Sequence, residues 1–236
     1  MPLLRDLNID IAVEDIARGR QTARARPLSP AVRIRLAELI ETVAANRWLQ
    51  PSIAYRIKPI TDRGDDWIEL DGAAKLHAPL VAHRMRPASH LALAVCTVGE
   101  QLSRQASEWF GSGNPARAVL LDEIGSIALT RLGDRCGELL REEAASLGLE
   151  LSGSLHPGDD GFAIEQQATV LRLAGGDELG VGLHGMSMLA PLKSLTGIYG
   201  LGKRMPRWSA GDNCATCRAR ERCSYRRDGS AAGLAA

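Results

Sequence analysis

Aromatic residues, long apolar runs and a surplus of either charge are all scarce in this chain of 236 residues. Phe, Trp and Tyr together make up 4% of the sequence, so Leu, Ile, Val and Ala must fill most of the core. No stretch approaches the number of consecutive apolar residues that a transmembrane helix needs. The N-terminal segment carries acidic side chains and no continuous apolar run, which argues against a signal peptide. The composition therefore predicts a cytoplasmic protein with no membrane partner.

The charges of the chain are nearly balanced, with 29 basic and 28 acidic residues and a formal net charge of +1. No overall field therefore draws the protein towards nucleic acid or an anionic surface. The length allows one large domain or two small ones, with a sizeable core.

Signatures of common enzymes are missing or incomplete. The sequence contains neither the H-E-x-x-H pattern of zinc hydrolases nor the G-x-S-x-G elbow of serine hydrolases. Gly197, Gly202 and Lys203 match a phosphate-binding G-x4-G-K loop. However, Arg204 replaces the Ser or Thr that would hold magnesium, and Pro206 opposes the helix that should follow. We interpret the match as a coincidence.

Helix-like and strand-like periodicities follow one another without a regular βαβ repeat. Ser29 and Pro30 are typical of the first residues of a helix. Expected helices cover 29–50, 100–110, 116–148 and 164–173; expected strands lie in 54–60, 67–72, 90–99 and 179–202, the last as a pair with a turn near Ala190–Pro191. This order of elements favours an α+β fold.

The five cysteines fall into two groups. Cys96 and Cys136 lie alone in apolar stretches and are predicted to be small buried side chains. Cys214, Cys217 and Cys223 form a C-x2-C-x5-C cluster, and clustered thiols in a reducing compartment are typical of metal sites. Three thiolates suit a zinc ion completed by His or Cys, or an iron–sulfur cluster with one outside ligand. An unliganded trio or a disulfide is the alternative.

Five segments of the sequence occur in a familiar order. They are LALAVCTVGEQL, AVLLDEIGSIAL, HPGDDGFAIEQQATVLRLAG, LGVGLHGMSMLAPLKSLTGIYG and CATCRARERCSYRR. Over roughly residues 50–227 the chain resembles stand-alone relatives of the activation domain of cobalamin (vitamin B12)-dependent methionine synthase. The resemblance implies a curved, twisted antiparallel sheet flanked by long helices. It also implies a C-terminal cysteine cluster, since such chains often end in one.

The resemblance further implies a function in reactivating an oxidised corrinoid. In that family an electron reduces Co(II), and S-adenosylmethionine traps the resulting Co(I) as methylcobalamin. The cobalamin is carried by a partner, either a corrinoid-binding protein or a cobalamin-dependent methyltransferase. The implied ligand-binding residues lie in two loops, which we expect to face each other across one cleft. They are His156, Pro157, Gly158 and Asp159 in the first loop and His184, Pro191, Lys193 and Ser194 in the second.

The chain departs from the family at three positions that bear on S-adenosylmethionine. Ser154 stands where the family has an Arg that binds the methionine carboxylate, Asp159 replaces a Tyr, and Thr130 replaces a Glu. A bidentate Arg–carboxylate contact is among the stronger polar interactions in proteins. We therefore predict that S-adenosylmethionine binds weakly or not at all.

A binding module is the alternative to a reactivation protein. Residues 203–227 hold eight Lys and Arg against two acidic residues, which suits a zinc knuckle that contacts nucleic acid or an acidic protein. Trp208 and Tyr225 are too few aromatic residues for a stacking platform, which argues against nucleic acid. We expect four parts: an N-terminal helical segment (1–50), an activation-domain-like α+β domain (51–205), the cysteine-cluster segment (206–227) and a disordered tail (228–236).

Overall fold

The computed structural model describes residues 2–19, 27–71, 74–217 and 220–221. The tail expected to be disordered lies outside these residues, as does Cys223. The helices are α1 (Val13–Gly19), α2 (Pro30–Ala45), α3 (Pro79–Arg84), α4 (Gln101–Gly111), α5 (Pro115–Ser146), α6 (Gln167–Ala174) and α7 (Ala210–Thr216), with short 3-10 helices η1 (Ile164–Gln166) and η2 (Gly176–Leu179). The strands are β1 (Leu3–Leu4), β2 (Ser52–Arg63), β3 (Trp67–Leu70), β4 (Ala74–His77), β5 (His90–Thr97), β6 (Glu150–Leu155), β7 (Gly182–His184), β8 (Met188–Ala190) and β9 (Ser194–Gly202).

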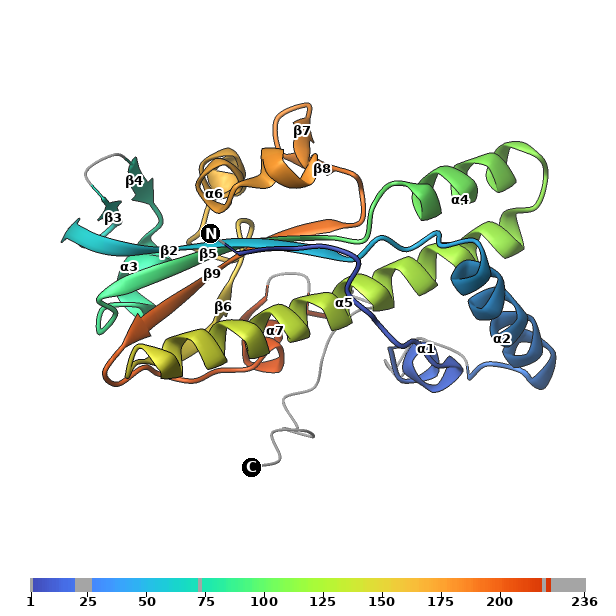
Figure 1. Cartoon of the computed structure of the whole chain (residues 1–236), viewed down its shortest axis with the longest axis horizontal. Coiled ribbons are helices and arrows are strands. Elements are labelled where there is room, and N and C mark those ends of the chain that lie inside the picture. Colours follow the sequence, from blue (N-terminus) through green and yellow to red (C-terminus); the bar gives the residue numbers. More distant parts are fainter. Residues whose placement is uncertain (1, 20–26, 72–73, 218–219, 222–236) are drawn as a thin grey trace.

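One antiparallel sheet forms the centre of the molecule (Figure 1). Its strand order is β4-β3-β2-β5-β9-β6, and β1 pairs with Ile53 and Ala54 at the start of β2. The 32-residue helix α5 runs along one face, and α6 with the β7–β8 hairpin lies over the other. The α+β class, with an antiparallel sheet flanked by long helices, is confirmed.

The two faces of the sheet bury separate apolar clusters. On the α5 face, residues such as Ala94 and Cys96 of β5 pack against Ala128, Leu132 and Cys136 of α5. On the α6 face, other residues of the same strands meet α3, α6 and the loop before η1. This division follows from strand geometry, because successive side chains point to opposite faces. A third cluster joins α2, α4 and the first half of α5 into a helical arm.

Several expected elements are present with small shifts in their ends. Ser29 caps α2, Pro30 is its first residue, and Gly148 follows α5 in the left-handed region at φ 68°. Sequence reasoning missed β6, whose Gly and Ser residues weaken the strand pattern. It also expected one pair of strands in 179–202, where the structure has the β7–β8 hairpin and then the longer β9. The segment 1–50, expected to be helical, contains α1 and α2 and also contributes β1 to the sheet.

Candidate functional site

The first predicted loop is a tightly hydrogen-bonded turn after β6. The backbone N–H of His156 donates to Oδ2 of Asp159 at 2.8 Å, and the N–H of Asp159 donates to the His156 carbonyl at 3.0 Å. Gly158, at φ 101°, donates its N–H to the carbonyl of Phe162, which is fully buried. The Asp159 carboxylate is therefore used to shape the turn.

The imidazole of His156 is fixed through both of its nitrogens. Nδ1 lies 2.7 Å from the carbonyl oxygen of Thr196, and Nε2 lies 3.1 Å from Oγ of Ser154. Since a carbonyl only accepts, Nδ1 carries a proton, and in the neutral ring Nε2 accepts from the Ser154 hydroxyl. Ser154 pairs with Tyr199 across β6 and β9, and burial raises the pKa of the Tyr199 phenol well above its ordinary value. His156 is thus a satisfied, half-buried histidine in a closed network.

The second predicted loop connects β8 to β9 and is held from both faces of the sheet. The ammonium of Lys193 lies 2.8 Å from Oδ1 of Asp122 and 2.8 Å from Oγ of Ser126, both on α5. Ser194 Oγ lies on the other face, 2.8 Å from Oγ1 of Thr97 and 2.7 Å from the carbonyl of Pro191. Lys193 and Ser194 therefore position the loop, with their polar groups turned inwards.

The structure places the two histidines on opposite faces of the sheet. A Cβ on Gly197 would lie 3.2 Å from the His156 ring and 3.7 Å from the Tyr199 ring, so this imidazole lies on the α5 face. His184 is exposed on the β7–β8 hairpin, whose leucines pack into the core on the α6 face. The single cleft that we expected between the loops does not join these histidines, because His156 follows β6 of the central sheet, whereas His184 lies on a separate two-stranded hairpin that packs on the opposite face.

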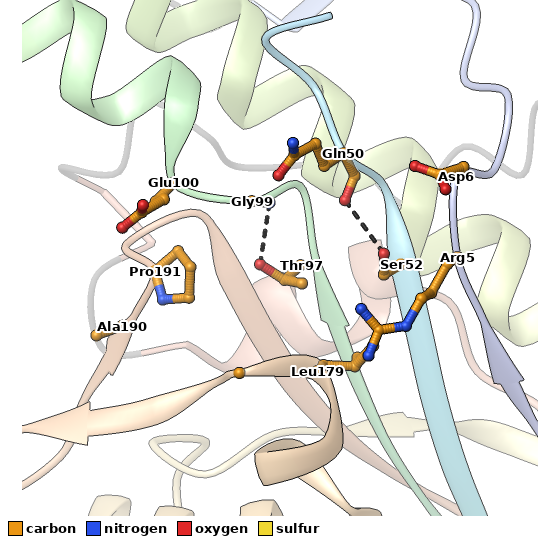
Figure 2. A pocket seen from close by; sticks show the side chains of 11 residues that line it. Arg5, Asp6, Gln50, Ser52, Thr97, Gly99, Glu100, Leu179, Ala190 and Pro191 are labelled. Atoms are coloured by element: carbon orange, nitrogen blue, oxygen red, sulfur yellow. Dashed lines mark hydrogen bonds between the residues drawn. The ribbon is translucent and has the colours of Figure 1, made fainter.

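A pocket of about 510 Å³ opens on the α6 face, where β5 ends and α4 begins (Figure 2). Of the predicted site residues it includes Pro191, and no residue of the first loop lines it. Its lining is Arg5, Asp6, Gln50, Ser52, Thr97, Gly99, Glu100, Leu179, Gly180, Ala190 and Pro191. Sequence reasoning missed the other ten, which come from segments far apart in the chain. In the sequence, the position of this pocket is indicated by the polar Thr97 and by Gly99, which end an otherwise apolar strand.

The cysteine segment is docked along the outer edge of β6. Trp208 Nε1 and Asn213 Nδ2 both donate to the carbonyl of Ser154, at 2.9 and 3.0 Å. Arg84 of α3 stacks over the Trp208 ring at 5.2 Å and donates to Oδ1 of Asn213 at 2.9 Å. The short helix α7 begins at this anchor with a capping box formed by Ser209.

Two of the three predicted metal ligands fall within the described residues. Cys214 is half-buried in α7, Cys217 is exposed at its end, and the Cys217 N–H donates to the Cys214 carbonyl at 3.3 Å. Across the described residues, no group of three or more His, Cys, Asp or Glu side chains could hold a metal ion. The third ligand, Cys223, lies outside those residues.

Cys96 and Cys136 are buried, as the sequence predicts. A hydrogen bond to Cys136, together with burial, raises the pKa of the Cys96 thiol well above its ordinary value. A raised pKa keeps a thiol protonated and unreactive. Both residues therefore serve as small core side chains between β5 and α5.

None of the helices in the described part of the chain combines the length and apolar character that a bilayer crossing requires. Comparison with solved structures identifies a shared fold. No family model and no curated protein matches the sequence. Among solved structures, the crystal structure of the MetH reactivation domain bound to AdoHcy is similar to this chain, with a TM-score of 0.63 and 13% sequence identity. The similarity covers 94% of this chain and 86% of that chain, so the two share a fold over nearly their whole length.

Proposed function

We propose that this protein is an accessory protein that reactivates a corrinoid-dependent methyltransferase. The observation that carries the proposal is the shared fold with the MetH reactivation domain over 94% of the chain. The resemblance in five sequence segments, which extends from β5 to the cysteine cluster, supports the same function. In this function the protein assists reductive activation of cobalamin that a partner carries.

The residues around the first loop support weak or absent binding of S-adenosylmethionine. Ser154, which replaces an Arg of the family, uses its hydroxyl in the hydrogen bond with His156. Asp159, which replaces a Tyr, accepts the N–H that closes its own turn. Neither side chain offers a cation or an aromatic ring to a ligand. Calorimetry should therefore give no dissociation constant in the low micromolar range, and such a value would contradict this part of the proposal.

The β7–β8 hairpin is the surface we assign to the corrinoid-bearing partner. Met186 is 84% exposed, Met188 is 57% exposed and Leu192 is 56% exposed, and the hairpin carries no acidic or basic residue other than His184. Methionine side chains adapt to irregular apolar surfaces, and grouped exposed apolar residues are typical of protein contacts. The hairpin lies next to the loop of Pro191, which the resemblance assigns to the same function.

Reductive activation tests the proposed function directly. The protein is added without oxygen to a cobalamin-dependent methyltransferase in the Co(II) state with a chemical reductant, with and without S-adenosylmethionine. The electron paramagnetic resonance signal of Co(II) should disappear faster when the protein is present. Equal rates with and without the protein, together with no detectable binding, would overturn the proposal.

A pair of variants tests the contact surface. Replacing both Met186 and Met188 by Ser should weaken binding to the methyltransferase about tenfold or more, as for central apolar residues of an interface. Ile34→Ser is the matched control, because Ile34 is 62% exposed on α2, away from the hairpin. If both variants lower the affinity equally, the hairpin is not the contact surface.

The cysteine segment is proposed to hold one metal centre through Cys214, Cys217 and Cys223, as either zinc or an iron–sulfur cluster. The turn that links Cys214 to Cys217 suits two ligands of such a centre. A bound cluster would supply one-electron chemistry, and zinc would supply structure alone. Metal analysis of anaerobically purified protein should give close to one centre per chain, whereas less than about a tenth of an equivalent would exclude it.

A further inference from the structure

The pocket on the α6 face contains a polar constellation that the proposed function does not use. Its floor is formed by Ser52 and Thr97, which are 7% and 4% exposed, at the ends of two neighbouring strands. Its volume, about 510 Å³, lies within the range of small-molecule sites. Figure 2 shows charged side chains around this floor, with Arg5 and Asp6 on one side and Glu100 on the other.

The N-terminal segment presents two consecutive side chains to the pocket. In a regular strand, Arg5 and Asp6 would point to opposite faces. Asp6 has φ 51°, a left-handed conformation that few residues other than Gly, Asn and Asp adopt readily. This breaks the alternation, and the N–H of Leu7 then bonds to the Pro51 carbonyl at 3.0 Å. The segment therefore holds a cation and a carboxylate at the same opening.

The guanidinium of Arg5 is oriented by η2. It donates to the backbone carbonyl of Glu178 at 2.5 Å, and the carboxylate of Glu178 forms an ion pair with Arg56 of β2. A guanidinium carries five N–H donors in a planar fork. The bond to Glu178 therefore fixes its direction and leaves further donors for an anionic group, with carboxylate as the best geometric match.

Acceptors for a cation lie beside Arg5 and across the floor of the pocket. Ser52 Oγ lies 3.3 Å from the Gln50 carbonyl, so the hydroxyl donates there and keeps its lone pairs as acceptors. Asp6 adds a carboxylate, and Glu100 adds a second that is paired with Arg104. Arg5 and Asp6 therefore balance each other. A bare anion would meet Asp6, and a bare cation would meet Arg5, whereas a ligand with both charges meets a partner for each.

We propose that this pocket binds a small zwitterion, specifically a free α-amino acid. The ligand carboxylate lies against Arg5, and the ligand ammonium lies against Asp6 and the Ser52 hydroxyl. The side chain of the ligand extends towards Leu179, Ala190 and Pro191. The charged and hydroxyl groups of this site, Arg5, Asp6 and Ser52, belong neither to the two predicted loops nor to the hairpin, whereas Ala190 and Pro191 are shared with the surface assigned to the partner.

A binding screen on the full chain tests the proposal. Thermal unfolding is followed with each of the twenty standard amino acids at about 10 mM, and any that stabilise the protein are measured by calorimetry. At least one should bind with a dissociation constant of about 1 mM or lower. Acetate, ethylamine and inorganic phosphate, which carry one sign of charge only, should bind at least about tenfold more weakly. If no amino acid binds, or if acetate or phosphate binds equally well, the proposal is overturned.

Two variants locate the binding in this pocket. Arg5→Gln and Asp6→Asn should each reduce the affinity for the best amino acid about tenfold or more, since each removes one charge partner. Arg204→Gln and Asp62→Asn remove the same charges at exposed positions outside the lining and should leave the affinity unchanged. Hydrogen exchange of the unmodified protein gives a second readout: the amino acid should slow exchange at residues 97–100. Unchanged affinity in both pocket variants, or protection elsewhere only, would refute the assignment.

Discussion

The two faces of the central sheet share the same strands but differ in how they are covered and in how their polar groups are partnered. On the α5 face, one 32-residue helix covers the sheet, and the polar groups of His156, Ser154 and Lys193 have partners inside the protein. The α6 face carries short helices, a two-stranded hairpin with exposed methionines and a polar pocket. A surface whose polar groups are internally paired stabilises the fold, whereas one with open donors and exposed apolar groups is available for binding. We therefore assign stability to the α5 face and recognition to the α6 face.

Core truncation should distinguish the faces most strongly. Leu132 of α5 is fully buried, so Leu132→Ala should lower the free energy of unfolding by about 2–5 kcal/mol. Leu189 of the hairpin is only partly buried, and Leu189→Ala should cost less than half as much. Urea unfolding of both variants measures the difference. Equal losses would mean that the hairpin is as much a part of the core as α5 and would break the comparison.

The contact between Lys193 and α5 should have the next largest effect. The Lys193 side chain is 12% exposed and that of Asp122 is 40% exposed. Lys193→Met should cost about 1–3 kcal/mol, because it leaves Asp122 and Ser126 without their donor. Adding Asp122→Leu should recover part of the loss if the unpaired carboxylate is its cause. A loss that persists undiminished in the double variant would place the cause in loop packing.

Stability at acid pH should depend on Asp15, which joins α1 to α5. Burial alone would raise the pKa of Asp15, but the Ala12 N–H and the guanidinium groups of Arg131 and Arg18 outweigh it and lower the pKa below 3.8. The folded state therefore favours the charged form, and the contribution is complete above pH 3.8 and is lost as pH falls through the folded pKa. The stability difference between the protein and Asp15→Asn should shrink below that pH. A difference that stays constant down to full acid unfolding would contradict the lowered pKa.

The smallest expected effect concerns the tautomer of His156. Nitrogen NMR should find the proton on Nδ1, because this atom faces the Thr196 carbonyl. Ser154→Ala should leave that assignment unchanged and cost about 1 kcal/mol, through loss of one hydrogen bond to Nε2. A proton on Nε2 in the native protein would mean that the ring is turned and free to serve a ligand.

Much of the fold could be predicted from the sequence, because its signals are local. Ser29 with Pro30 marks the start of α2, and the apolar run of β5 marks a buried strand. The site was harder, since it depends on which face each residue of β9 meets. Lys193 and Ser194 are neighbours in sequence, yet they bond to opposite layers. No local pattern could pair Arg5 with Thr97, because the sheet brings them together over 92 positions of sequence.

β6 is an edge strand of the central sheet, so its outer side has no neighbouring strand within the described residues. An exposed edge strand offers its unpaired backbone N–H and C=O groups to any other extended chain, which is a common route to aggregation. Here the indole of Trp208 and the side-chain amide of Asn213 both donate hydrogen bonds to the carbonyl of Ser154. The cysteine segment is thus also a cover against strand addition, whatever its thiols bind. A chain that ends at Gly202 would expose β6, and its tendency would be to polymerise edge to edge.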